Sequence, residues 1–203
     1  MNCIEKYIPH FMECMYSKDC KDLVRRDELI DMFNPNQMNS KNEALKAIEK
    51  LPKDEVKHVA YIGSWFGYLT RILCKELDYV ITEIDIDERC KSVSEVVNLD
   101  YKFEKRTLFH RSWDANKISN NYYQQFDMII NLSTEHMTDE WFNNLSVGTF
   151  VLLQSNNFDS HRDHTNCVYS IEELKERFPL HIKLYESTLP CTIYDRYTLM
   201  GIT

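Results

Sequence analysis

The sequence predicts an α/β fold: a doubly wound, mostly parallel seven-stranded sheet with a C-terminal antiparallel hairpin strand and an N-terminal helical extension. From residue 56 onward, short apolar segments alternate with helical segments, a pattern typical of parallel strands joined by crossover helices. The last two apolar segments instead follow each other through a short turn that contains Pro190. They therefore form a hairpin, in which at least one strand runs antiparallel to the rest.

Residues 1–52 contain no clear strand and are expected to form the helical extension, which packs on the sheet domain or covers its site. The expected helices span 4–17, 21–33 and 41–51. The stretch Asn34-Pro35-Asn36 predicts a turn. Ser40 and Glu43 have the spacing of a capping box that opens the third helix, which Pro52 ends.

Residues 53–203 are expected to form one sheet domain without internal repeats or flexible linkers. The expected strands are 56–63, 79–85, 106–112, 126–133, 148–156, 181–188 and 194–202. The expected helices are 68–77, 87–99, 138–145 and 170–178. Thr138 is the expected cap of the third of these helices, and Ser170 with Glu173 forms a capping box at the fourth.

Composition narrows the class of protein. The net charge of -8 gives weak evidence against a nucleic-acid partner, because phosphate binding depends on positive charge. The seven cysteines include no C-x-x-C pair, and the N-terminus lacks the pattern of a signal peptide. No window approaches the roughly 18 apolar residues of a membrane helix. We therefore expect a cytoplasmic protein with reduced thiols and no membrane partner. The oligomeric state is left open.

A short glycine loop follows the first expected strand, with the sequence Gly63-Ser64-Trp65-Phe66-Gly67. In a doubly wound sheet this turn offers backbone N–H groups and a helix N-terminus to a ligand at the carboxyl ends of the strands. Glycine permits the sharp turn and a close approach of the backbone. A tight turn without any ligand explains the same two glycines equally well.

Two acidic positions point to a nucleoside ligand. Asp85 ends the second strand, about 20 residues after Gly63, where such folds place the carboxylate that binds ribose hydroxyls. Glu83 is the reserve candidate, and a charged start to the next helix is the alternative explanation. After the third strand, Trp113 and Asp114 have the chemistry to stack on and hydrogen-bond an adenine. A core tryptophan beside a capping aspartate is the alternative there.

Together these residues resemble the class I S-adenosylmethionine-dependent methyltransferases, over roughly residues 56–202. The resemblance rests on the glycine loop, Asp85, Asp114 and the strand Asp127-Met-Ile-Ile-Asn131. It implies a Rossmann-like domain that binds S-adenosylmethionine through Gly63, Ser64, Trp65, Gly67, Asp85, Trp113, Asp114 and Asn131. Two positions depart from the family pattern. Trp65 stands at the middle glycine, and Tyr61 replaces an acid that commonly helps hold the methionine end of the cofactor.

Glu135 and His136 follow the fourth strand, at the edge of the sheet where this architecture builds its sites. Either side chain suits a general base or an acceptor ligand, and histidine titrates near neutral pH. The alternative is that this segment simply leads into the helix expected at 138–145. We expect Glu135 and His136 to act in catalysis.

The loop after the fifth strand is polar and rich in histidine. Asn156, Asn157, His161 and His164 are the expected substrate contacts. His161, His164 and Cys167 share three-residue spacings and could form a metal site with His136. The spacing is not a recognised zinc pattern, so no metal site is predicted from the sequence.

The predicted function is S-adenosylmethionine-dependent methyl transfer to a small polar acceptor. The Asn/Asp-Pro-Pro-Tyr/Phe motif is absent after strand four, which disfavours planar amines of DNA or glutamine as acceptors. The departures at Trp65 and Tyr61 leave two alternatives open. One is another reaction of the same cofactor, aminocarboxypropyl transfer or cofactor cleavage. The other is a catalytically degenerate fold that serves as a binding or scaffold protein.

Overall fold

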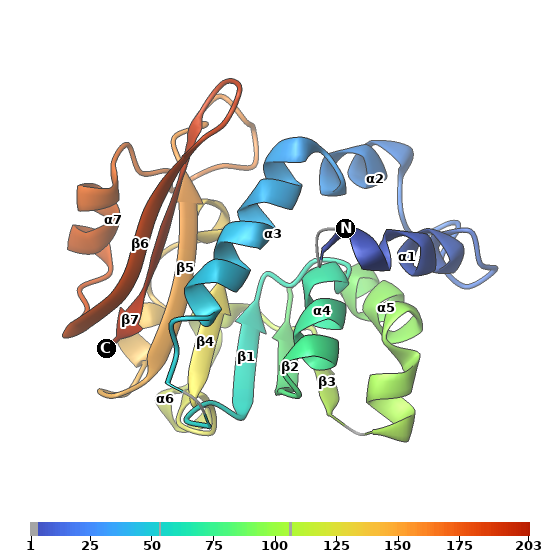
Figure 1. The fold of residues 1–203 in the computed structure, drawn as a ribbon, viewed down its shortest axis with the longest axis horizontal. Helices are drawn as coiled ribbons and strands as arrows, with labels where there is room; N and C mark the ends of the chain where they lie inside the picture. Colours follow the sequence, from blue (N-terminus) through green and yellow to red (C-terminus); the bar gives the residue numbers. More distant parts are fainter. Residues whose placement is uncertain (1–3, 53, 106) are drawn as a thin grey trace.

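Seven strands form a single mixed sheet in the computed structural model, which describes residues 4–52, 54–105 and 107–203. The strand order is β3-β2-β1-β4-β5-β7-β6 (Figure 1). The strands are β1 His58–Ile62, β2 Val80–Ile84, β3 Leu108–Arg111, β4 Met128–Asn131, β5 Phe150–Asn156, β6 Ile182–Pro190 and β7 Asp195–Ile202. Strands β1, β2, β3, β4 and β5 are parallel to one another, whereas β7 is antiparallel to both β5 and β6. The predicted fold class is confirmed. Residues 53 and 106, at the expected start of the domain and of the third strand, lie outside the described residues.

Helices cover both faces of the sheet (Figure 1). They are α1 Ile8–Met15, α2 Arg26–Met32, α3 Pro35–Ile48, α4 Tyr68–Glu76, α5 Glu88–Val97, α6 Asn120–Tyr123 and α7 Ile171–Arg177. Short 3-10 turns occur at Glu5–Tyr7, Ala115–Lys117, Thr134–His136 and Phe142–Asn144, and a π turn at Asp100–Glu104. Helices α3, α4 and α5 lie on one face, and α6 and α7 lie on the other. This is the doubly wound arrangement that the alternation of strands and helices predicts.

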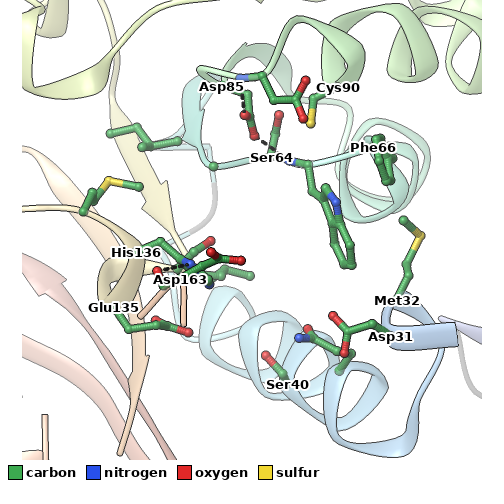
Figure 2. Close-up of a pocket in the computed structure, with 18 of the residues that line it drawn as sticks. Asp31, Met32, Ser40, Ser64, Phe66, Asp85, Cys90, Glu135, His136 and Asp163 are labelled. Carbon is green, nitrogen blue, oxygen red and sulfur yellow. Dashed lines mark hydrogen bonds between the residues drawn. The ribbon is translucent and has the colours of Figure 1, made fainter. Parts of the chain in front are cut away.

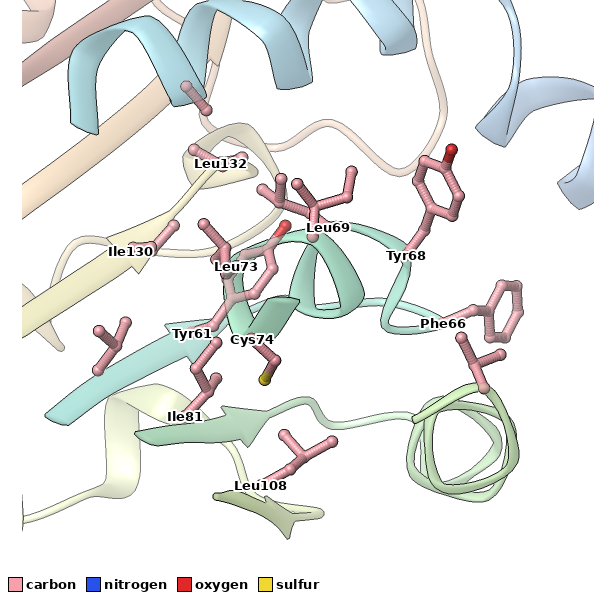
Figure 3. Packing of buried hydrophobic residues seen from close by; sticks show 14 of the residues in the cluster. Tyr61, Phe66, Tyr68, Leu69, Leu73, Cys74, Ile81, Leu108, Ile130 and Leu132 are labelled. Carbon is pink, nitrogen blue, oxygen red and sulfur yellow. The ribbon is translucent and has the colours of Figure 1, made fainter. Parts of the chain in front are cut away.

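The two faces carry separate apolar cores. Leu69 and Leu73 of α4 pack with Ile81 and Ile130 of the sheet on the first face (Figure 3). On the second face, Leu174 of α7 packs with Ile129 and Val151, which point to the opposite side of the sheet. All seven residues of β5 are buried. Strands buried on both faces appear in the sequence as continuous apolar runs, which is why the central strands were predictable.

Helix α3 begins earlier than the sequence pattern indicates. The Asn34 side chain caps it by accepting a hydrogen bond from the Gln37 backbone N–H at 2.8 Å, and Pro35 takes the first helical position. The predicted turn at Asn34-Pro35-Asn36 is thus the helix start. Ser40 is not a cap, because it lies inside the helix and its hydroxyl donates to Gln154 of β5 at 2.5 Å.

The α-helix expected at 138–145 does not form. The segment contains only the 3-10 turn Phe142–Asn144, so Thr138 caps no α-helix. Trp141 is fully buried beside Phe178, and its backbone N–H donates to the Asn116 side chain at 3.0 Å. These contacts hold the chain in an irregular path. At α7, by contrast, Ser170 accepts from the Glu173 backbone N–H at 3.0 Å, as the capping pattern predicts.

The N-terminal helices share a core with the sheet domain. Phe11 of α1 packs edge-on against Tyr68 of α4 with 5.4 Å between ring centroids, and Arg89 of α5 forms an ion pair with Glu28 of α2. The extension therefore covers α4 and α5, while the boundary at residue 52 stays a prediction. The six described cysteines are free thiols, and Cys3 lies outside the described residues. Among the described residues, no helix is both long and apolar enough to cross a bilayer.

Candidate functional site

A cavity of about 1120 Å³ opens at the carboxyl ends of the parallel strands, between the sheet and helices α2 and α3. This is the position where doubly wound sheets bind their ligands. The predicted site residues that line it are Gly63, Ser64, Trp65, Asp85, Trp113, Asp114, Glu135, His136, Asn156, His161 and His164. Gly67, Asn131 and Asn157 do not line it. One cavity therefore collects side chains that are far apart in the sequence.

The glycine loop joins β1 to α4 through left-handed backbone. Gly63 has φ +63°, and a Cβ there would lie 3.0 Å from the Ser133 hydroxyl. Trp65 has φ 54°, a conformation that L-residues other than glycine seldom adopt. Its ring stacks on Phe66 with 5.4 Å between centroids. Trp65 thus has a backbone conformation that suits the glycine expected at this position, and it differs from that glycine in its side chain.

Asp85 connects the end of β2 to this loop. Its carboxylate accepts hydrogen bonds from the backbone N–H groups of Trp65 and Asp87, both at 3.0 Å (Figure 2). Burial raises the pKa of Asp85, and the two N–H donors limit the rise. Each carboxylate oxygen has two acceptor sites, so Asp85 can still accept hydrogen bonds from a ligand in the cavity.

Gly67 has a packing role. It precedes α4 with φ +75°, and a Cβ there would lie 2.0 Å from the Ser94 hydroxyl of α5. The Asn98 side chain donates to the Gly67 carbonyl at 3.2 Å. The second glycine of the loop therefore permits the close approach of α4 and α5, outside the cavity.

Trp113 and Asp114 border the cavity beyond β3. The Trp113 ring is 43% exposed and contacts Tyr122 edge-on, with 5.1 Å between centroids. Asp114 caps the turn Ala115–Lys117 by accepting from the Asn116 backbone N–H at 3.1 Å. An exposed aromatic face beside a partly engaged carboxylate can receive a flat heterocycle.

Glu135 lies in the 3-10 turn after β4 and is 1% exposed. Its Oε1 accepts from the Asn156 side chain and lies 3.7 Å from a guanidinium nitrogen of Arg196. Among the described residues, Oε2 has no hydrogen-bond partner. Burial raises the pKa of Glu135, and the charge of Arg196 opposes this shift. The group is a buried carboxyl with one free oxygen.

Two histidines lie beside Glu135. The Nδ1 of His136 is 3.0 Å from the Asp163 carbonyl oxygen, and the Nδ1 of His164 is 2.6 Å from that of Phe158. Their ring centroids are 4.6 Å apart, and burial lowers the pKa of both. His161 is exposed, with its ring centroid 4.6 Å from that of His164. The Glu135 carbonyl accepts from the backbone N–H groups of 165 and 166, which ties this loop to the turn after β4.

Asn131 and Asn157 shape the loops beside the cavity. Asn131 is fully buried and accepts from the Ser133 backbone N–H at 3.0 Å. Asn157 accepts from the Asp195 backbone N–H at 2.7 Å, which holds the start of β7. Their polar contacts are with backbone and side-chain groups of the protein, and neither asparagine lines the cavity.

Lys41 of α3 and Arg196 of β7 line the cavity but were not predicted. Both are buried, and burial together with the charge of Arg196 lowers the pKa of Lys41 to about 7. Arg196 is the second residue of β7, between Asp195 and the largely apolar remainder of the strand, and a charge beside buried strand residues is a weak sequence signal for a buried functional group. Lys41 gives no such signal, because a lysine in an amphipathic helix ordinarily faces solvent.

No family model and no curated protein sequence matches this chain. Its fold is similar to solved structures. N-methyltransferase NodS from Bradyrhizobium japonicum WM9 has a TM-score of 0.60 at 15% identity, over 85% of this chain and 98% of that one. Haemonchus contortus phosphoethanolamine N-methyltransferase 2, in complex with phosphomonomethylethanolamine and S-adenosylhomocysteine, has a TM-score of 0.64 at 11% identity, over 97% of this chain.

This chain spans 60% of the length of the Haemonchus enzyme. MtNAS, in complex with MTA and tNA, has a TM-score of 0.58 at 12% identity, over 98% of this chain and 71% of that one. At such identities the likeness shows the fold, which is the Rossmann-like fold of class I S-adenosylmethionine-dependent methyltransferases.

Proposed function

We propose that this protein is an S-adenosylmethionine-dependent methyltransferase that acts on a small polar acceptor. The observation that carries the proposal is the position of Asp85. Asp85 directly follows β2, and its carboxylate lines the cavity and is hydrogen-bonded to the glycine loop after β1. This is where Rossmann-like folds place the acid that binds a ribose diol. The similar solved structures, which include methyltransferases, support the same assignment.

The residues present fit this cofactor. Asp85 would accept the two ribose hydroxyls, while Gly63 and Ser64 would offer a small surface to the rest of the molecule. Trp113 and Asp114 would border the adenine. A volume of about 1120 Å³ exceeds what the cofactor alone requires, which leaves room for an acceptor.

The acceptor would lie on the side of the cavity formed by the loops after β4 and β5. Figure 2 shows Glu135 and His136 across the cavity from Asp85 and Ser64. S-adenosylmethionine, when bound, supplies an electrophilic methyl group on its sulfonium. Glu135 and His136 would orient the acceptor heteroatom and take up its proton as the new bond to carbon forms. Alignment of this kind supplies much of the rate in a direct displacement.

The test is incubation of the protein with candidate polar acceptors and cofactor labelled either in the methyl group or in the aminocarboxypropyl group. Methyl transfer predicts that only the first label appears in the acceptor, with S-adenosylhomocysteine as the second product. Transfer of the second label, or a labelled lactone without a modified acceptor, would contradict the proposal and favour another reaction of the same cofactor.

A further inference from the structure

Glu135, His136 and His164 form a compact cluster on the cavity wall. One donor atom from each residue, a carboxylate oxygen or an imidazole nitrogen, lies within 4.8 Å of those from the other two. They come from the turn after β4 and the loop after β5, which the Glu135 carbonyl connects. The sequence spacing alone had pointed away from a metal site, because it matches no known pattern.

Backbone carbonyls fix the tautomer of both histidines. A carbonyl oxygen only accepts hydrogen bonds, so the Nδ1 atoms of His136 and His164 must carry the protons donated to residues 163 and 158. In a neutral ring, Nε2 then has a free lone pair. Metal-binding histidines show this arrangement almost always, with the other ring N–H donated to a carbonyl or carboxylate.

Glu135 is held in a comparable way. Asn156 donates to Oε1, and Arg196 lies near the same oxygen, whereas the buried Oε2 has no hydrogen-bond partner among the described residues. A buried acceptor without a partner costs about 1–3 kcal/mol, and a bound cation would remove this cost. Arg196 does not fill this role, since 3.7 Å separates its nitrogen from Oε1 rather than from Oε2.

We propose that Glu135, His136 and His164 bind a divalent transition-metal ion, with Zn²⁺ as the best match, at the side of the cavity opposite Asp85. Two imidazoles and one carboxylate form the donor set of many catalytic zinc sites, in which a fourth position stays open. Mg²⁺ prefers oxygen ligands and would bind poorly here. Metal binding can be tested whether or not methyl transfer occurs, but it uses Glu135 and His136. In the metal-bound protein the acceptor heteroatom would therefore bind at the open position of the ion, and these two side chains would hold the ion instead of taking up the proton.

The geometry needs a modest adjustment. Ligand atoms around a tetrahedral ion at about 2.0–2.2 Å lie about 3.3–3.6 Å from one another, so donors that lie up to 4.8 Å apart must move closer together. Rotation of the half-buried His164 side chain and of His136 can supply this movement. The open position would face the cavity, where it can take an oxygen or nitrogen atom of a bound molecule.

The first experiment measures metal content. The full chain, stripped with a chelator and then dialysed against equimolar Zn²⁺, is expected to retain one equivalent by elemental analysis, and Co²⁺ should give the visible absorption of a low-symmetry site. Glu135→Gln, His136→Ala and His164→Ala should each weaken Zn²⁺ affinity by at least tenfold. His181→Ala is the matched control, because His181 is exposed and outside the cluster, and it should bind as the wild type does.

Two results would overturn the site: failure of the wild type to bind Zn²⁺ at micromolar concentration, or equal affinity in the wild type and all three cluster variants. Thermal unfolding of each metal-free variant shows whether it is folded. If an alanine variant does not fold, Glu135→Gln still tests the site, because it preserves the shape of the side chain. Titration of metal-free protein with S-adenosylmethionine is a separate readout. A failure of the cation site is thereby distinguished from a failure of the proposed methyltransferase function.

Discussion

The backbone N–H of Trp65 donates a hydrogen bond to the Asp85 carboxylate, with 3.0 Å between the nitrogen and Oδ2. This contact joins the loop after β1 to the end of β2, the two places from which a Rossmann-like fold binds a nucleoside. The residue that departs most from the expected glycine loop is therefore bonded to the proposed ribose ligand. The bulky side chain of Trp65 is thus compatible with a backbone position from which its N–H reaches Asp85.

Removal of the Asp85 carboxylate should weaken cofactor binding. Asp85→Ala loses charge-assisted hydrogen bonds to the ribose, so the affinity for S-adenosylmethionine should fall by about 1–3 kcal/mol, roughly 5- to 150-fold. Isothermal titration calorimetry measures the change. Glu172→Ala, which removes an exposed acid in the first turn of α7, is the control and should leave the affinity unaltered. Equal affinity in Asp85→Ala and the wild type would reject Asp85 as the ribose ligand.

At position 65, a glycine variant should be more stable than an alanine variant, which is the reverse of the usual order of stability. Both remove the ring, but only glycine adopts φ 54° without strain. Trp65→Gly should therefore be more stable than Trp65→Ala by about 1 kcal/mol. Urea unfolding of the pair measures the difference. An alanine variant as stable as the glycine variant would show that the left-handed conformation is not kept.

Two of the three glycines with positive φ, Gly67 and Gly148, form a matched pair. Alanine at Gly148 meets no atom within 4 Å, so it should cost only the backbone strain of about 1 kcal/mol. Alanine at Gly67 would in addition place its Cβ 2.0 Å from the Ser94 hydroxyl, and should cost about 1–3 kcal/mol more. Chemical denaturation of both variants checks this. Similar losses at the two positions would contradict the close approach of α4 and α5.

The burial of Lys41 predicts a pH-dependent gain in stability on its replacement. Its folded pKa of about 7 lies below the ordinary value of 10.5, while Arg196 and Asp31 are the charged groups that affect it. Below pH 7 the lysine is charged in both states and pays its full burial penalty. Between pH 7 and 10.5 the unfolded chain binds the proton more tightly, so the penalty fades as pH rises.

Lys41→Met keeps the apolar stem without the charge. It should stabilise the fold by a few kcal/mol at pH 6, at about 1.4 kcal/mol per pKa unit, and by much less at pH 9.5. Urea titrations of the wild type and the variant at both pH values measure the difference, because other titrating groups cancel between the two proteins. A gain that is independent of pH, or larger at pH 9.5, would contradict a depressed pKa for Lys41.

The sheet was predictable because its signals are local. Central strands such as Phe150–Asn156 begin with a run of apolar residues, and Ser170 caps its helix through a contact only three residues away. Asn34-Pro35 was misinterpreted because the same dipeptide occurs in turns and at helix starts. The missing helix near Trp141 depends on contacts with distant residues, which no local pattern records.

The candidate site was predictable only in part. Asp85 and Glu135 stand at strand ends, so topology places both at the same edge of the sheet. The position of Gly67 at a helix contact, rather than in the cavity, depends on the packing of α4 against α5. The cluster of Glu135, His136 and His164 depends on the path of an irregular loop. The sequence identified both histidines as candidate site residues, but it did not predict that they lie beside Glu135.

The proposed function depends on the binding of S-adenosylmethionine in the cavity beside Asp85. Calorimetric titration of the full chain with S-adenosylmethionine and with S-adenosylhomocysteine measures this binding. We predict saturable binding of each ligand at one site per chain, with micromolar dissociation constants and competition between the two. The absence of binding at millimolar ligand would contradict the claim and favour a scaffold protein that retains the fold without the cofactor.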